Sequence, residues 1–450
     1  PVMADQGIVE LSQQDARKPP GTYSGTARRM TLSTPARACG IDFGTSNSTV
    51  GWLRPGAPTL LPLEDGKPTL PSAVFFNADE ESTHYGRDAL LEYLEGYEGR
   101  LMRALKSLLG SSLMDGSTEV GGRALPFKDL LASFIGELKR RAEAQAERSF
   151  EQAVFGRPVY FVDDNPVADQ RAQDTLEAIA RQVGFRDVSF QFEPIGAALH
   201  YEASLTQEEL VLIADIGGGT ADFSLVRLSP ERARHVDRTS DLLGNAGLHV
   251  GGTDFDRALS LECVMPLLGY KGLMKSGAEV PSGLFFQLAT WHTINFAYTR
   301  QAFADFQSIY RDATVRRELD RLARLIGQRE GHWMALQVEQ AKIDLSTEPS
   351  TRLHLDRLAP GLSPDTPCAA FTLATRSRVE RVAATVSELL DQAGLARQQV
   401  DTVYFTGGAS GVPQLRARIA AELPHARSVE GDLFGSIGAG LAVEAARRYG

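Results

Sequence analysis

The chain has 450 residues, of which 43% are hydrophobic and 23% charged, so it is long enough for two or more domains and falls outside the disordered and membrane classes. Its formal net charge of −10 argues against a general binder of nucleic acid or of anionic membranes, because those partners need a positive surface. The three cysteines, Cys39, Cys263 and Cys368, match no zinc-binding spacing. Without an apolar run of transmembrane length or a secretory h-region, we expect a cytoplasmic protein.

The first 37 residues mix Gln, Asp, Arg, Pro, Gly and Ser without any period, and we interpret residues 1–37 as a flexible arm. Order is expected to begin at Ala38, where an apolar strand, a glycine turn and a second strand follow over residues 38–50. The same sequence of strand, aspartate, glycines, threonine and strand returns at residues 210–226. Two copies of one hairpin predict a duplicated fold.

The rest of the chain alternates between helical and strand patterns. Between the hairpins, the periodicity predicts a helix-rich region at 86–150, a strand at 157–162 and a helix at 166–183. A glycine-rich turn at 247–252 follows the second hairpin and is succeeded by helices, and helices again alternate with a strand from residue 376 onward. This alternation predicts α/β lobes.

Each hairpin tip carries groups that suit a phosphate. A turn rich in Gly and Thr points several backbone N–H groups the same way, and such a nest binds phosphate oxygens. One carboxylate precedes each tip, Asp42 in the first and Asp215 in the second, and paired carboxylates beside a polyphosphate suit Mg²⁺ that keeps most of its water. A single such loop is more often a tight turn with a capping aspartate, but two copies in the same order weaken that alternative.

Other phosphate and hydrolase signatures are missing from the sequence. Neither the P-loop string nor the dinucleotide-binding string occurs, and the H-E-x-x-H and G-x-S-x-G strings do not occur either. The paired hairpins must therefore carry the phosphate chemistry.

Five segments, taken in order, resemble the nucleotide-binding domain of the heat-shock protein 70 chaperones. Within the two hairpins, Gly40–Thr49 resembles the first phosphate loop of that family and Asp215–Ser224 the second. The other three segments are Gly251–Asp256, similar to a GGxDFD turn, Val338–Ser346, similar to the adenosine-binding helix, and Thr406–Pro413, similar to the adenosine glycine turn. Each match alone is modest, and five in family order are specific.

The resemblance implies an α/β, actin-like ATPase fold, that is, a duplicated ribonuclease H-like fold with two lobes of two subdomains each. We assign residues 38–207 to lobe I, with a helical subdomain at about 73–151, and residues 208–428 to lobe II, with a helical subdomain at about 249–351. Residues 429–450 are expected to form a C-terminal segment that returns to lobe I.

The resemblance also implies roles for individual residues. Lys106 would reach the γ-phosphate, although its local string alone fits an ordinary solvated lysine. Glu193 would help to hold the water shell of the metal, and Thr220 and Asp222 would position the attacking water and receive its proton. With Asp215, these residues form the catalytic set, and the metal would be held by Asp42 and Asp215, largely through water. The implied nucleotide-binding residues are Gly44, Thr45, Ser46, Asn47, Gly217, Gly218, Gly219, Gly251, Gly252, Glu339, Lys342, Ser346, Gly407, Gly408 and Asp432.

The adenosine-binding residues include both a match and a departure. Glu339, Lys342 and Ser346 are spaced so that they share one face of a helix, although a solvated face with an ion pair has the same spacing. The family places an arginine against the adenine where this chain has Ile343, and a Ser-x-Arg string where it has Ala409-Ser410-Gly411. A more apolar base pocket is therefore expected.

The aromatic stretch at residues 289–296 is interpreted chiefly as core packing. It is also similar to the short, lidless members of the family, the YegD type. The function implied is a Mg-ATP-binding, slowly hydrolysing, chaperone-like nucleotide switch without a peptide-binding domain, with ATP/ADP and Mg²⁺ as cofactors and a protein client or co-chaperone as possible partner. Two alternatives remain open: an actin-like filament-forming or scaffold protein, and a small-molecule kinase of the same fold that uses Asp222 as its base.

Overall fold

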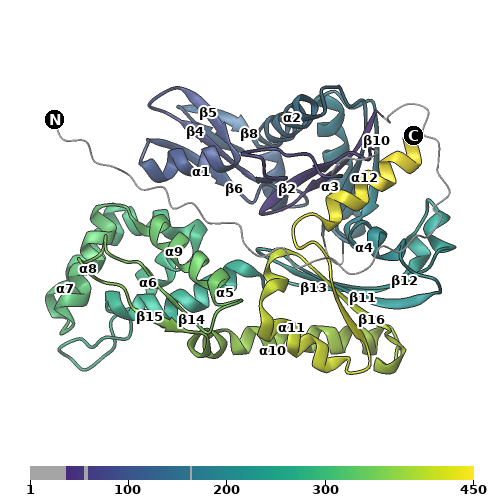
Figure 1. Cartoon of the computed structure of the whole chain (residues 1–450). Coiled ribbons are helices and arrows are strands. Elements are labelled where there is room, and N and C mark those ends of the chain that lie inside the picture. The colour runs from purple at the N-terminus through teal and green to yellow at the C-terminus, as the bar shows by residue number, and fades with distance from the viewer. Residues whose placement is uncertain (1–36, 55–58, 163–164) are drawn as a thin grey trace, which may run out of the picture. The chain divides into compact units, whose positions relative to one another are not determined.

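Two five-stranded sheets of the same topology organise the chain (Figure 1). The computed structural model describes residues 37–54, 59–162 and 165–450, so the predicted N-terminal arm lies outside the described residues except for its last position. The strand orders are β10-β9-β1-β2-β3 and β13-β12-β11-β16-β17. In each sheet an antiparallel hairpin is flanked by one further antiparallel strand and, on its other side, by two parallel strands. The two halves of the chain are thus duplicates of one plan.

The sheet of lobe I has a fully buried central strand. Its strands are β1 (Ala38–Phe43), β2 (Asn47–Gly51), β3 (Thr69–Pro71), β9 (Gln152–Arg157) and β10 (Asp187–Phe192). All six residues of β1 are buried, which explains why its sequence reads as a continuous apolar run. The strand predicted at 157–162 is wrong, because β9 ends at Arg157. Pro158 follows and has no N–H for the sheet ladder.

Smaller elements complete lobe I. They are β4 (Ala73–Asn77), β5 (Ser82–Tyr85), β6 (Gly99–Arg103), β7 (Ser117–Val120), β8 (Arg123–Pro126), α1 (Gly86–Glu95), α2 (Phe127–Ala146), α3 (Pro166–Gln182) and α4 (Glu193–Glu202). The expectation of a helix-rich region at 86–150 missed β6, β7 and β8. These strands have four or five residues and are largely unburied, so their alternation is weak.

Lobe II contains the second large sheet and most of the remaining helices. Its strands are β11 (Glu209–Ile216), β12 (Ala221–Leu228), β13 (Leu242–Leu248), β14 (Ser350–Arg352), β15 (Asp365–Pro367), β16 (Thr402–Thr406) and β17 (Arg427–Glu430). Its helices are α5 (Gly252–Leu259), α6 (Gly283–Leu288), α7 (Arg300–Asp312), α8 (Arg316–Gly327), α9 (Gly331–Asp344), α10 (Cys368–Gln392) and α11 (Pro413–Glu422). One large apolar core joins these helices to the sheet.

Helices α4 and α12 (Ser436–Tyr449) lie between the two large sheets (Figure 1). Residues of α4, among them Ile195, share an apolar cluster with the lobe II sheet, whereas Leu441 of α12 shares one with the lobe I sheet. The two helices approach closely, since a Cβ built on Gly440 would stand 1.9 Å from the carbonyl oxygen of Gly196. This contact ties the last helix of the chain to both lobes.

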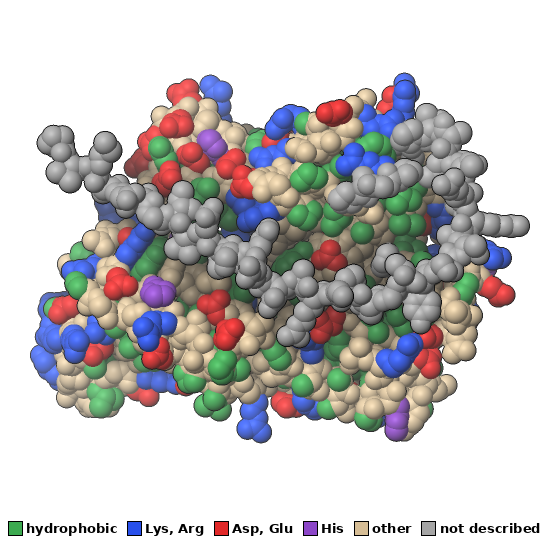
Figure 2. Space-filling model, viewed as in Figure 1, with side chains coloured by type: hydrophobic (Ala, Val, Ile, Leu, Met, Phe, Trp, Pro, Cys, Tyr) green, Lys and Arg blue, Asp and Glu red, His purple; other side chains and the backbone are tan. Residues whose placement is uncertain are grey.

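The described surface carries charges of both signs over most of the viewed face (Figure 2). Among the described helices, none combines the length and the apolar character needed to cross a bilayer. The three cysteines are free thiols, and burial raises the pKa of Cys39 well above its usual range. The described chain is therefore held together by packing and polar contacts rather than by disulfides.

Candidate functional site

The predicted catalytic residues meet where the two central hairpins end. Asp42 lies on β1 and Asp215 on β11, whereas Glu193 is the first residue of α4. Lys106 lies in a short 3₁₀ helix (Leu105–Leu108) that follows β6. The Lys106 ammonium donates a hydrogen bond to Glu193 Oε1 and forms an ion pair with it. Four segments that are distant in the sequence thus bring one cation and three carboxylates together.

The charges in this cluster perturb one another. Burial, with a further contribution from Glu193, raises the pKa of Asp42 to about 7. Burial followed by the carboxylates of Asp222, Glu193 and Asp42 raises the pKa of Asp215 to about 8. Burial alone would lower the pKa of Lys106. The neighbouring carboxylates, Glu193 first, outweigh that effect, so the pKa of Lys106 lies above its usual value. Ionising all three carboxylates would therefore place more negative charge at the site than its single lysine balances.

Asp215 and Asp222 face each other across the second hairpin. They are register partners on the antiparallel strands β11 and β12, so their side chains emerge on the same face. Asp222 also lies beside β13, where a Cβ on Gly247 would stand 2.8 Å from its Oδ1. The turn that joins the two strands closes through a hydrogen bond from the Gly217 N–H to the Thr220 carbonyl. The predicted water-positioning residues thus adjoin the predicted metal carboxylate.

The two predicted phosphate loops face each other directly. A Cβ on Gly218 would lie 2.1 Å from the hydroxyl oxygen of Ser46, so a larger residue there would require the Ser46 side chain to move. Ser72 holds the first loop, Gly44–Asn47, through two hydrogen bonds. Its hydroxyl donates to the Gly44 carbonyl at 2.6 Å, and its N–H donates to the Ser46 carbonyl at 2.9 Å. Backbone and serine groups from both hairpins therefore border the same space.

The Gly251-Gly252 turn is packed against the second phosphate loop. The N–H of Gly252 donates to the Gly217 carbonyl at 3.0 Å, and both the N–H and the hydroxyl of Thr253 donate to the Gly218 carbonyl. A Cβ on Gly251 would stand 2.6 Å from the backbone of Gly218 and Gly219. The glycine is required by this close approach of two backbones rather than by its own dihedral angles.

Lys342, one of the predicted adenosine-binding residues, lies beside this turn. Lys342 of α9 forms an ion pair with Asp256 of α5 at 2.8 Å, and its ammonium lies 3.5 Å from the Gly252 carbonyl oxygen. Burial raises the pKa of Asp256 to about 6, although Lys342 opposes that rise. Glu339 is half-buried on the same helix. Ser346 lies beyond the end of α9 at Asp344, and its hydroxyl donates to the Lys342 carbonyl.

The second glycine turn brings an aromatic ring to the predicted adenosine site. Gly407 has φ +79°, and a Cβ there would stand 2.5 Å from Asp215 Oδ1. A Cβ on Gly408 would meet the ring of Phe434 at 2.6 Å. Asp432 accepts a hydrogen bond from the Phe434 N–H at 3.1 Å, so it shapes the loop that presents this ring. Phe434 is 54% exposed and Ile343 is 53% exposed.

The sequence analysis missed a contact between the two lobes. Tyr93 of α1 donates a hydrogen bond to Asn295 Oδ1 at 2.8 Å, and its hydroxyl lies 3.1 Å from His332 Nδ1. The guanidinium of Arg103 stacks 4.3 Å from the ring centre of Trp291. Trp291 and Asn295 belong to the aromatic stretch that was interpreted as core packing. Ile294 of that stretch is core, whereas Trp291 and Asn295 take part in this inter-lobe cluster.

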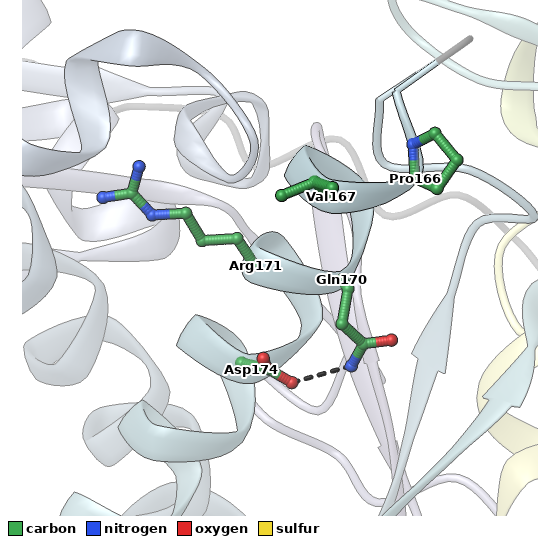
Figure 3. A pocket seen from close by; sticks show the side chains of 5 residues that line it. All are labelled: Pro166, Val167, Gln170, Arg171 and Asp174. Carbon is green, nitrogen blue, oxygen red and sulfur yellow. Dashed lines mark hydrogen bonds between the residues drawn. The ribbon is translucent and has the colours of Figure 1, made fainter.

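A shallow hollow on the described surface lies elsewhere. It borders the first turns of α3 and is lined by Pro166, Val167, Gln170, Arg171 and Asp174 (Figure 3). Gln170 donates to Asp174 at 2.7 Å, and Asn165 caps the helix by accepting from the Ala168 N–H. None of the predicted site residues lines it. We therefore place the candidate site at the hairpins, where the titratable groups and glycine loops converge.

Comparison with known proteins defines the class of this fold. Residues 38–266, about half of the chain, match the family model described as Hsp70 protein. The duplicated lobes and the α/β sheets are those of an actin-like ATPase fold, as the sequence predicts.

The chain belongs to the Hsp70 family. It is 26% identical over 389 residues to proteins named chaperone protein DnaK from Thermotoga neapolitana, Thermotoga petrophila and Thermotoga maritima. Each alignment covers 84% of this chain and 54% of the relative. The chain thus spans about half the length of the curated relatives that it matches.

Proposed function

We propose that this chain binds Mg-ATP between its two lobes, hydrolyses it slowly and works as a chaperone-like nucleotide switch. The observation that carries the proposal is the meeting of two glycine hairpins, with Ser46 against Gly218, beside a buried cluster of carboxylates and one lysine. Membership of the Hsp70 family and the similarity to the DnaK chaperones support it. A protein client or co-chaperone is proposed as partner on the same grounds.

The residues of the cluster fit a hydrated magnesium ion. Burial first, and then neighbouring carboxylates, raises the pKa values of Asp42 and Asp215, and a bound divalent cation would favour their ionised forms. Oxygen ligands are the kind that Mg²⁺ takes, and this ion usually keeps several waters. Asp42, Asp215 and Glu193 would hold it, and the bound ion would neutralise charge on the phosphates.

The side chains of this chain would then act on the nucleotide and on the attacking water. The N–H groups of Gly44–Asn47 and Gly217–Gly219 would hold the phosphate oxygens as two facing nests. Lys106, already buried and paired with Glu193, would place its ammonium at the γ-phosphate, where negative charge spreads in the transition state. Asp222 would accept the proton of a water positioned with the help of Thr220.

We further propose that the adenine rests on an apolar surface. Ile343 stands where related sequences place an arginine against the base, and Ala409 and Gly411 remove a second cation. The exposed ring of Phe434 lies against Gly408 of the adenosine glycine turn, and Ile343 is exposed at the end of α9. The exposed aromatic ring beside this turn offers a flat partner to a base. Lys342, with Asp256, and Glu339 would address the ribose.

The test is a calorimetric titration of the purified chain with ATP and with ADP, each with and without Mg²⁺, followed by an assay of phosphate release. We expect binding that requires Mg²⁺ for full affinity, and release of phosphate with water as the only acceptor. Lys106→Ala should reduce turnover far more than affinity. Lys128→Ala is the matched control, because Lys128 is half-exposed and pairs with the equally exposed Asp115. A folded chain that neither binds nor cleaves ATP would refute the proposal.

A further inference from the structure

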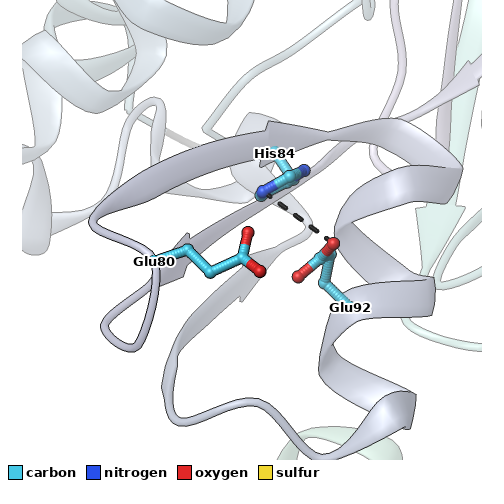
Figure 4. A group of neighbouring side chains, drawn as sticks. All are labelled: Glu80, His84 and Glu92. Atoms are coloured by element: carbon cyan, nitrogen blue, oxygen red, sulfur yellow. Dashed lines mark ion pairs between the residues drawn. The ribbon is translucent and has the colours of Figure 1, made fainter.

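A histidine and two glutamates converge on the outer side of lobe I, away from the nucleotide site. Glu80 lies in the turn between β4 and β5, His84 lies on β5, and Glu92 lies on α1 (Figure 4). One ligand atom from each lies within 4.8 Å of the other two, and no other group of this kind occurs among the described residues. His84 Nε2 is 4.0 Å from Glu92 Oε1.

Neighbouring residues hold these side chains in place. The Asn77 amide donates to Glu92 Oε2 at 2.7 Å, which leaves Oε1 directed at His84. The Asn77 side-chain oxygen accepts from the N–H groups of Asp79 and Glu80, so the same residue fixes the turn that carries Glu80. Partners that orient ligands in this way are a regular feature of metal sites. Asn77 is 3% exposed, so this support is part of the core.

The charge around the group favours a cation. Figure 2 shows acidic side chains gathered over the β4–β5 hairpin with a histidine among them. Glu80, followed by Glu92 and Glu95, raises the pKa of Tyr97, which reports a negative potential at this surface. Among the described residues, Glu92 forms an ion pair with His84. Neither Glu80 nor Glu92 pairs with a lysine or arginine in this part of the chain.

We propose that Glu80, His84 and Glu92 form a binding site for a divalent transition-metal ion of the zinc type. Imidazole nitrogens and carboxylate oxygens are both zinc ligands, and three protein ligands leave a fourth position for water. Zinc-bound ligand atoms stand roughly 3–3.5 Å apart, so the side chains must close by about an ångström, and Glu80 is exposed and free to do so. The Ser82 hydroxyl, 2.8 Å from His84 Nε2, must rotate away.

The ligand types separate this site from the proposed magnesium site. Mg²⁺ prefers oxygen ligands throughout, whereas an imidazole suits zinc, nickel and copper. A bound ion would join the β4–β5 turn, β5 and α1 into one unit, since each supplies one ligand. The site therefore predicts zinc binding that saturating Mg²⁺ does not displace.

The test is a calorimetric titration of the nucleotide-free chain with zinc chloride in the presence of saturating Mg²⁺. We expect one site, with affinity at least about tenfold weaker in His84→Gln and in Glu92→Gln, and weaker by a smaller factor in Glu80→Gln, whose side chain is exposed. His425→Gln is the matched control, because His425 is exposed and belongs to no such group; its affinity should equal that of the wild type.

A spectroscopic measurement accompanies the titration. Cobalt(II) in place of zinc should give visible absorption bands of a four- or five-coordinate centre, and these bands should be lost in His84→Gln. Zinc affinity that is equal in the wild type, His84→Gln and Glu92→Gln would overturn the site and leave an ordinary surface ion pair. Loss of affinity in His84→Gln alone, with both glutamate variants unchanged, would overturn it equally.

Discussion

A fall in pH is expected to destabilise this protein through one residue, His332 of the inter-lobe cluster. His332 is 5% exposed, and burial lowers its pKa from 6.5 to about 4, with the Arg103 guanidinium adding to the effect and a backbone hydrogen bond at Trp291 opposing it. The folded pKa lies below the unfolded one, so between these values the unfolded state binds more protons. The stability contributed by the neutral imidazole is therefore complete above pH 6.5 and is lost as the pH falls toward 4.

The size of the effect follows from the two pKa values. A shift of one unit corresponds to about 1.4 kcal/mol, so the full difference is roughly 3 kcal/mol, of which about 2 kcal/mol is lost between pH 7 and pH 5. His332→Gln removes the titrating group. Its unfolding free energy should therefore fall by about 2 kcal/mol less than that of the wild type over this range.

Two measurements check this reasoning. Urea unfolding of the wild type and of His332→Gln at pH 7 and pH 5 gives the difference, and NMR titration of the His332 ring gives its pKa directly. Tyr93→Phe is the control, because it removes the hydroxyl near His332 but leaves the ring buried, and should keep the wild-type pH dependence. Parallel pH profiles for the wild type and His332→Gln, or a ring pKa near 6.5, would refute burial as the cause.

The remaining predictions concern the proposed ATP site and are measured by calorimetry and phosphate release. Lys106→Ala should slow hydrolysis roughly 100-fold with a smaller change in Kd, whereas Asp215→Asn should weaken both; full activity in either variant would contradict the proposed roles. Ile343→Arg should tighten ATP binding about fivefold by adding a cation over the base, and an unchanged Kd would place the base elsewhere. Phe434→Ala should weaken ATP binding about fivefold, with Phe434→Leu less affected; equal affinity in all three chains would exclude a contact with the ring.

The architecture was predictable because the two hairpins have the same order of residue types, which indicates a duplication. A strand, an aspartate, glycines and a second strand occur twice, and both copies became the central hairpin of a five-stranded sheet. Elements defined by weak patterns were not predictable. The short strands β6, β7 and β8 are largely unburied and lack a clear alternation. The prediction of a strand at 157–162 did not take account of Pro158, which directly follows the end of β9.

Some residues of the candidate site could be predicted from the sequence, and others could not. Residues inside a motif, such as Asp215, were predicted because glycines mark the turn beside them. Asp256 lies in the quoted turn at 251–256, but only the fold shows that it pairs with Lys342, 86 residues away. Tyr93 and Asn295 carry no local signal, because their contact joins positions 202 residues apart. Such pairs depend on tertiary packing, which no local pattern encodes.

The charge balance of the site links the proposed ligand to the geometry of the lobes. Asp42 belongs to lobe I and Asp215 to lobe II. Beyond the effect of burial, Asp42 adds to the rise in the pKa of Asp215, and Lys106 opposes the rise in the pKa of both groups. Any cation held between the two carboxylates therefore favours arrangements in which the lobes approach, and the loss of that cation disfavours them. A ligand shifts such an equilibrium only by its differential affinity for the two arrangements. Under the proposed function, Mg-ATP would contact both hairpins at once and would therefore have such a differential affinity.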